Sequence, residues 1–250
     1  MITTNKTNKV SEESINIRYS DLDFDKCLKP FSLLNFFQDI ASDNAEQLGF
    51  GYSYIYPRDY MWVLLKYRIE FEEYPKDIQD LILRTEPRGY QKIFAFRNFE
   101  LLSQNKVLAK ASSMWSLVNI KTKSLASIEK IIPADIFPKF ESNEKDLSFG
   151  KIPTLNKIDY RKDFEVRYND IDVNRHANNG NYIVWALEPI DLEFRMNHTL
   201  KNIDMFFKKE VKYGEKLTSE VEILNENTTL HRLHHTKTGE DLCLVKCEWI

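Results

Sequence analysis

Apolar positions in residues 31–48 recur at intervals of three and four, which is the spacing of one buried helix face. Gly49 follows this run directly, and glycine is common just after the end of a helix. A second run with helical spacing extends from Tyr182 to Ile190 and contains Pro189 near its end. The pattern therefore predicts two helices that lie far apart in the chain.

Each predicted helix is followed by segments in which apolar and polar residues alternate, as they do in half-buried antiparallel strands. In the first half these segments are residues 61–71, 80–85, 92–102 and 107–119. In the second half they are residues 202–211, 217–224, 228–235 and 242–250. A helix followed by a run of strands predicts the α+β class, with the helix packed on one face of an antiparallel sheet.

The chain also repeats a short sequence. Residues 17–23 read Ile-Arg-Tyr-Ser-Asp-Leu-Asp, and residues 166–172 read Val-Arg-Tyr-Asn-Asp-Ile-Asp, a shift of 149 positions with four of seven residues identical. Because a predicted helix and several predicted strands follow each heptad, we interpret the chain as two copies of one unit. The alternative is a single irregular α+β domain in which the likeness is accidental.

The repeat suggests domain boundaries. We expect a disordered lead over residues 1–14, an N-terminal domain over 15–125, a linker over 126–160 and a C-terminal domain over 161–250. The predicted linker has little pattern and contains three of the chain's prolines. Two copies in one chain can pack as a dimer of single units packs, so a monomeric pseudo-dimer and a homodimer both remain open.

Composition excludes several classes of protein. The net charge of -3 argues against a nucleic-acid-binding surface, and no apolar run approaches the roughly 18 residues that a membrane helix needs. Cys27, Cys243 and Cys247 lack the spacing of a zinc site or a disulfide framework. Free cysteines fit a reducing compartment, and the polar N-terminus lacks a signal peptide's apolar core. We therefore expect a cytoplasmic protein without membrane insertion.

Residues 170–182 are the densest polar run, and they lie just before the second predicted helix. Asn and Asp favour loops and helix caps. The start of a helix also offers free backbone N–H groups that can polarise a carbonyl. With the shift of 149, Asn174 aligns with Asp25 and His176 aligns with Cys27. The second copy alone carries the Asn-x-His pair, which predicts one active site per chain.

The pattern Asp172-x-Asn174-x-His176-x-Asn178-Asn179-x-x-Tyr182-x-x-Trp185 resembles the signature of acyl-ACP thioesterases from bacteria and plastids. Weaker likenesses in the first half lie at residues 18–23, 38–41, 48–49, 62–64, 74–75, 97–99 and 111–115. The resemblance implies two tandem hotdog domains, each an antiparallel sheet wrapped around a long helix. It also implies an enzyme without a cofactor or metal. Such an enzyme hydrolyses the thioester of a fatty acyl chain on acyl carrier protein (ACP), which releases free fatty acid and holo-ACP and ends fatty acid synthesis.

The resemblance further implies a set of site residues. The catalytic group is Asp172, Asn174, His176 and Glu210, and the substrate contacts are Asn178, Asn179, Tyr182 and Trp185. Glu210 is expected on a strand as the general base, with Asn174 positioning the water and Asp172 holding Asn174 or His176. His176 is expected to orient the substrate carbonyl or to share in proton transfer. Many plant members carry a cysteine directly after this glutamate, but Val211 stands here, so the predicted nucleophile is water.

Other readings remain open. Asp, Asn and His near a helix start are often only caps. An acyl-CoA thioesterase of the hotdog superfamily would differ only in the carrier, a hotdog dehydratase is expected to use another arrangement of His and acid, and a non-catalytic module would bind acyl chains without turnover. The basic residues Arg175, Lys208, Lys209 and Lys212 are candidates for meeting an acidic carrier protein.

Overall fold

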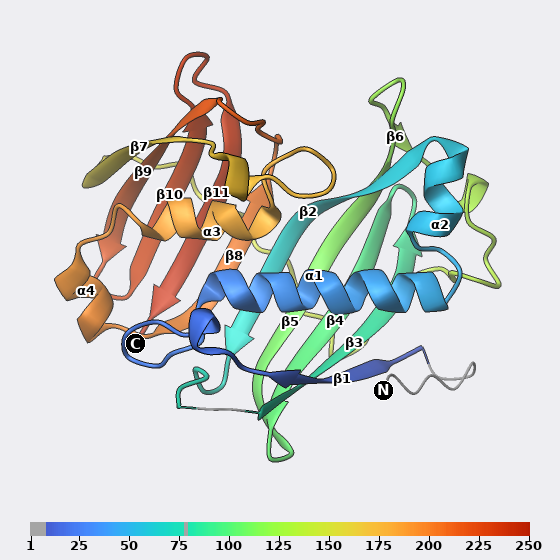
Figure 1. The fold of residues 1–250 in the computed structure, drawn as a ribbon, viewed down its shortest axis with the longest axis horizontal. Helices are drawn as coiled ribbons and strands as arrows, with labels where there is room; N and C mark the ends of the chain where they lie inside the picture. The colour runs from blue at the N-terminus through green and yellow to red at the C-terminus, as the bar shows by residue number, and fades with distance from the viewer. Residues whose placement is uncertain (1–8, 78–79) are drawn as a thin grey trace.

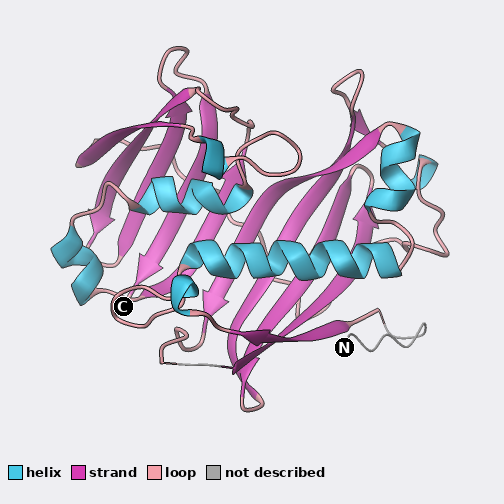
Figure 2. Ribbon diagram, viewed as in Figure 1, coloured by secondary structure: helices cyan, strands magenta, loops and turns pink. Residues whose placement is uncertain are grey.

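The computed structural model describes residues 9–77 and 80–250, and its two main helices lie against one side of a single antiparallel sheet (Figures 1 and 2). The first half contains β1 (Ser11–Asn16), η1 (Tyr19–Asp21), α1 (Pro30–Gln47), α2 (Tyr52–Ile55), η2 (Tyr56–Arg58), β2 (Tyr60–Phe71), β3 (Asp80–Gln91), β4 (Phe94–Ser103), β5 (Lys106–Asn119), β6 (Leu125–Ala126) and η3 (Ile128–Lys130). The second half contains β7 (Tyr160–Glu165), η4 (Tyr168–Asp170), α3 (Asn179–Leu187), α4 (Leu192–Asn197), β8 (Leu200–Phe207), β9 (Lys216–Asn225), β10 (Thr228–His235) and β11 (Asp241–Trp249).

The order of the strands makes the repeat visible. The sheet runs β1-β3-β4-β5-β2-β8-β11-β10-β9-β7, so each half contributes its strands in the same order, counted inwards from its own edge. β2 and β8 pair at the centre, where Arg68 lies opposite Asp204 and the two side chains form an ion pair at 2.6 Å. The sheet is therefore continuous across the halves, whereas the resemblance implied one antiparallel sheet for each half.

The two helices are unequal. α1 spans 18 residues, whereas α3 spans nine. The shorter helix ends two residues before Pro189, which lacks the N–H that a continuing helix needs. The expectation of a long helix in each half is therefore wrong for the second half, where α3 and α4 are separate.

Two boundaries differ from the sequence pattern. β1 begins at Ser11, so residues 11–14 belong to a strand, while residues 1–8 of the expected disordered lead lie outside the described residues. The strand expected over residues 202–211 ends at Phe207, which leaves Glu210 in the segment that follows β8. The repeated heptads lie just after β1 and β7.

The apolar face of α1 forms the core of the first half. Leu33, Leu34, Phe37 and Ile40 are all at most 3% exposed, which confirms the helical spacing of this segment. The Phe37 ring stacks on Phe99 of β4 with their centroids 4.6 Å apart. Because a buried aromatic side chain contributes several kcal/mol, this packing fixes α1 across the sheet.

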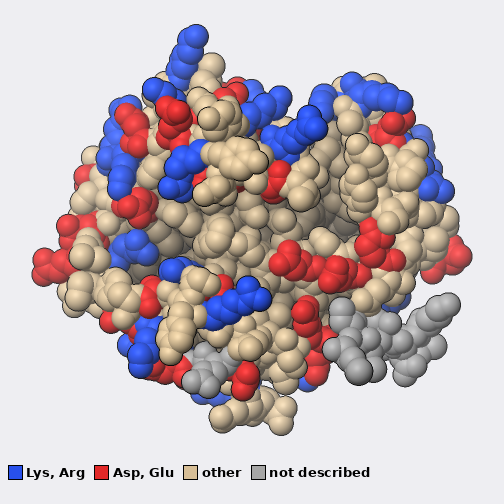
Figure 3. Space-filling view, viewed as in Figure 1, with Lys and Arg blue, Asp and Glu red and all other residues tan. Residues whose placement is uncertain are grey.

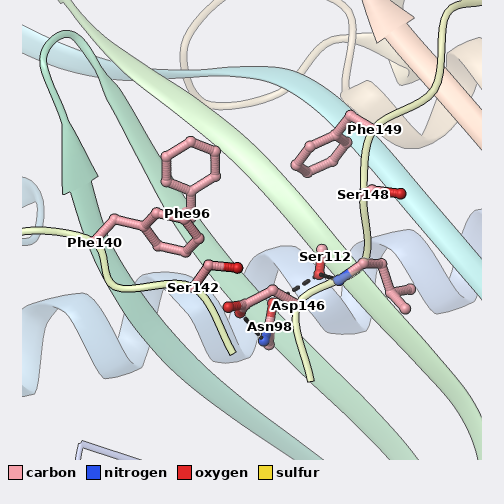
Figure 4. Close-up of a pocket in the computed structure, with 9 residues that line it drawn as sticks. Phe96, Asn98, Ser112, Phe140, Ser142, Asp146, Ser148 and Phe149 are labelled. Carbon is pink, nitrogen blue, oxygen red and sulfur yellow. Dashed lines mark hydrogen bonds between the residues drawn. The ribbon is translucent and has the colours of Figure 1, made fainter. Parts of the chain in front are cut away.

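Part of the connection between the halves crosses the opposite face of the sheet (Figure 4). Asp146 in this segment accepts hydrogen bonds from Arg88 at 2.8 Å and from Asn98 at 2.7 Å. The Leu147 N–H donates to the Ser112 hydroxyl at 3.0 Å. Burial alone would raise the pKa of Asp146, but hydrogen bonds from Arg88, the Asn143 N–H and Asn98 outweigh it and hold the pKa below its usual range.

Replacing Asp146 by Ala is expected to lower the free energy of unfolding by about 2 kcal/mol at neutral pH, because charge-assisted hydrogen bonds are lost. The depressed pKa means that this contribution is present above the unfolded-state value and is lost as the pH falls through the folded-state value. Urea unfolding of wild type and variant at several pH values measures it. Asp135→Ala, an exposed carboxylate in the same connection, is the control. An equal loss in both variants would contradict the role given to Asp146.

Candidate active site

A tight loop after η4 carries three of the predicted catalytic residues. The Asp172 N–H donates to the His176 carbonyl at 2.9 Å, and the Arg175 N–H donates to the Asp172 carbonyl at 3.0 Å. Arg175 has a φ of 64°, the left-handed conformation that closes the turn. The Asp172 carboxylate accepts the Asn174 N–H at 2.8 Å and the Asn174 side-chain amide at 3.4 Å. Of the two partners expected for Asp172, the structure gives it Asn174.

His176 and Glu210 come together from two segments. The imidazole Nδ1 lies 3.4 Å from a Glu210 carboxylate oxygen. The Ala177 N–H donates to the Val211 carbonyl at 2.9 Å and so holds the two segments against each other. The His176 side chain is 19% exposed and the Glu210 side chain 46%, so a ligand can reach both. The separation is longer than an ideal hydrogen bond, as is common in catalytic sites without substrate.

Tyr182 holds the two peptide groups on either side of Glu210. Its hydroxyl donates to the Lys209 carbonyl at 3.2 Å and accepts the Val211 N–H at 3.2 Å. The side chain is 2% exposed, and burial raises its pKa, so the hydroxyl keeps the proton that it donates. Trp185 is 3% exposed and packs edge-on against Tyr182 at 5.5 Å. These two predicted substrate contacts are thus buried behind the site, where they support the segment that carries Glu210.

Replacing Tyr182 by Phe is expected to lower kcat about 10-fold with little change in KM, because Glu210 loses the support on both sides while the ring still fills its place. Steady-state kinetics measure both constants. Tyr74→Phe is the matched control, since this tyrosine of the first half also donates from a largely buried hydroxyl, to the Leu28 carbonyl at 2.7 Å. If both variants lose activity equally, the effect is general destabilisation and the positioning role fails.

The start of α3 brings the two halves together. The Asn178 side chain caps the helix by accepting the Gly180 N–H at 2.7 Å, so that donor is not free for an oxyanion. The Asn179 amide donates to the Gln38 side chain of α1 at 3.2 Å. A Cβ on Gly180 would lie 3.0 Å from the Phe31 ring, so a glycine permits this close approach of α3 to α1. Asn178 and Asn179 therefore shape the helix start next to the catalytic loop.

The first half keeps the backbone of this loop without its acid–base pair. The Asp23 N–H donates to the Cys27 carbonyl at 2.9 Å, Lys26 has a φ of 59°, and the Leu28 N–H donates to the Pro75 carbonyl at 2.9 Å. These contacts match those of Asp172, Arg175 and Ala177 one for one. The match puts Cys27 at the place of His176 and Tyr74 at the place of Glu210.

Cys27 and Tyr74, at the equivalent places in the first half, do not form an acid–base pair. Burial raises the pKa of the Cys27 thiol, and nearby Asp23 raises it further, so the thiol stays protonated. Burial also raises the pKa of Tyr74. We name residues 17–28, the first-half counterpart of the catalytic loop, the twin loop.

Comparison with known proteins decides the family. The family model for the acyl-ACP thioesterase N-terminal domain matches residues 8–136. The model for the acyl-ACP thioesterase C-terminal domain matches residues 155–250. The chain belongs to the acyl-ACP thioesterase family. Its relatives include a chloroplastic acyl-[acyl-carrier-protein] hydrolase of Cuphea viscosissima, 24% identical over 256 residues. That match covers 95% of this chain but 61% of the plant protein, so the chain spans less than two thirds of that relative.

Solved structures of acyl-ACP thioesterases share the fold. The acyl-ACP thioesterase of Bacteroides thetaiotaomicron is 22% identical with a TM-score of 0.87, and the match covers 99% of this chain and 100% of the other. The 12:0-ACP thioesterase of Umbellularia californica is 21% identical with a TM-score of 0.88, covering 97% and 98%. These likenesses confirm the α+β architecture of this family member.

Other regions of this acyl-ACP thioesterase family member lie apart from the His176–Glu210 pair. The cavity of about 200 Å³ in Figure 4 is lined by Phe96, Phe140 and Phe149 on the opposite face of the sheet. Within residues 9–77 and 80–250, the acidic, histidine and cysteine side chains form no group able to hold a metal ion. In the same part of the chain, no helix combines the length and apolarity needed to cross a membrane.

The contacts that position His176 and Glu210 are not visible in the sequence. Gln38 lies in a stretch that resembles the family, but nothing local shows that it contacts Asn179. The double contact of the Tyr182 hydroxyl has no local signal either, because it joins residues that lie 27 and 29 positions apart in the chain. Such contacts depend on which elements meet in space.

Proposed function

We propose that this chain hydrolyses the thioester of a fatty acyl chain carried on ACP, and that its halves act as two tandem hotdog units with one active site. The observation that carries the proposal is the His176–Glu210 pair, which the catalytic loop and the segment after β8 bring together, and whose places in the first half hold Cys27 and Tyr74. Membership of the acyl-ACP thioesterase family supports the same substrate class. The free fatty acid and the carrier thiol would be the two products.

The proposed reaction uses water as the nucleophile. Glu210 takes a proton from water as the water oxygen bonds to the thioester carbonyl carbon. The C–S bond of the resulting intermediate then breaks, and the proton passes to the departing sulfur. His176 orients the carbonyl and shares in this transfer through its contact with Glu210. Asn174, fixed by Asp172, directs the water.

The test is hydrolysis of acyl-ACPs from C8 to C18 beside the matching acyl-CoAs, measured as release of free thiol. Fast release from ACP and slow release from CoA would establish the carrier and identify the preferred chain length. Faster release from acyl-CoA would mean that coenzyme A, and not ACP, carries the acyl chain. Binding of acyl chains without release from either carrier would refute hydrolysis and favour a non-catalytic module.

A further inference from the structure

We infer that exposed apolar and cationic residues around the catalytic loop form the docking surface for the carrier protein, an inference that rests on the proposed function. The residues are Tyr168, Val173, Arg175, Lys212 and Tyr213, which we name the docking patch. They come from the two segments that bring His176 and Glu210 together. The occupant is an acidic carrier protein whose prosthetic arm delivers the thioester to that pair.

The apolar members of the docking patch are unusually open to water. Val173 is 97% exposed, Tyr168 is 82% exposed and Tyr213 is 68% exposed. Single exposed apolar residues are common on protein surfaces, but three around one catalytic pair need an explanation. The Gly214 N–H donates to the Val166 carbonyl at 2.9 Å and holds the turn with Tyr213 beside the segment with Tyr168.

The docking patch also carries two cationic side chains, those of Arg175 and Lys212. Lys208 and Lys209, which the sequence suggested as carrier contacts, are paired with Asp241 and Glu240. Arg175 and Lys212 are exposed, and within the described residues neither side chain forms an ion pair. Figure 3 shows many Lys and Arg around the upper part of the molecule, with some Asp and Glu among them, and a row of Asp and Glu over α1. An acidic partner is therefore attracted to the edge that carries the catalytic loop.

The twin loop is an internal comparison, because it has the same shape with different charge. Tyr19 and Phe24 occupy the places of Tyr168 and Val173 and are 97% and 70% exposed. Lys26, at the place of Arg175, is paired with Asp77 at 3.0 Å. Asp25 stands where the catalytic loop has Asn174. Lys76, at the place of Lys212, is also exposed and within the described residues forms no ion pair. Apolar exposure and one free lysine are thus common to both loops, whereas a free Arg175 and a neutral Asn174 belong to the catalytic loop alone.

The test compares matched substitutions on the two loops. Val173→Glu and Lys212→Glu are expected to raise KM for an acyl-ACP about 10-fold, because each adds negative charge facing an acidic partner. Val173→Lys is expected to lower this KM. Phe24→Glu and Lys76→Glu, at the equivalent places in the first half, are expected to leave it unchanged. Every KM is compared with that for the same acyl chain on N-acetylcysteamine, a neutral thioester without a carrier.

A titration of holo-ACP by fluorescence anisotropy separates docking from catalysis. Weaker binding by Val173→Glu and Lys212→Glu, with wild-type binding by Phe24→Glu and Lys76→Glu, supports the docking patch even if no thioester is hydrolysed, a result that would overturn only the proposed function. Equal weakening by variants on both loops overturns the docking patch. So does a rise in KM that is equally large for the N-acetylcysteamine thioester.

Discussion

Glu210→Gln is expected to lower kcat by a factor of about 10²–10⁴, because the amide cannot take the proton from the attacking water. Gln keeps the size of the side chain and its contact distance to His176, so binding of the acyl chain should change little. Single-turnover hydrolysis of an acyl-ACP measures the chemical step directly.

His176→Ala is expected to show a loss of similar order, since it removes the other half of the pair.

Glu240→Gln is the matched control for this loss. Glu240 is also a half-exposed glutamate, and its ion-pair partner Lys209 is the residue before Glu210. Its variant should therefore keep wild-type turnover. If Glu210→Gln also kept near wild-type turnover, the assignment of the general base would be wrong, whatever the carrier.

The stability of the protein is expected to fall by about 3 kcal/mol as the pH decreases from 6.5 to 4, because of His231 alone. Burial lowers the pKa of this histidine to about 4. Its Nδ1–H donates to the Ala186 carbonyl of α3 at 2.7 Å, and its Nε2 accepts the Thr229 hydroxyl proton at 2.8 Å. Both ring nitrogens are hydrogen-bonded in the neutral form, and burial disfavours the charged form.

The sign follows from the two states. Between pH 6.5 and 4 the unfolded chain binds a proton at His231 and the folded chain does not, so unfolding becomes easier as the pH falls. Urea unfolding across this range measures the slope, and His231→Gln should remove about 3 kcal/mol of it. His235→Gln, a partly exposed histidine on the same strand, is the control and should keep the slope. A wild-type slope in His231→Gln would contradict the prediction.

Local pattern predicted the elements of the fold well, because burial is what creates the pattern. The spacing of residues 31–48 predicted α1 to within a residue at each end. The pairing of β2 with β8 could not be predicted in this way, since nothing along a strand identifies its partner. Arg97 shows another limit: a charged side chain is expected at the surface, yet it is 6% exposed and donates to Asn44 and Thr85.

Part of the candidate site can be predicted from the sequence, because some of its residues lie close together in the chain. Asp172, Asn174 and His176 lie within five residues, so their place on one loop was visible in the chain. Glu210 entered only through the resemblance to a family, and the hydrogen bond between Ala177 and Val211 explains why it meets His176. For Tyr182, sequence spacing does not distinguish a side chain that faces the site from one that supports the site from behind.

The central pairing of β2 with β8 has a consequence for synthesis of the chain. β2 lies between β5 and β8, so one of its edges stays unpaired until residues 200–207 have left the ribosome. Unpaired strand edges recruit other strands, and a nascent first half would offer its edge to a second nascent chain. The ion pair between Arg68 and Asp204 favours pairing of β2 with β8 over pairing with another chain. It stabilises only the register in which these two residues face each other.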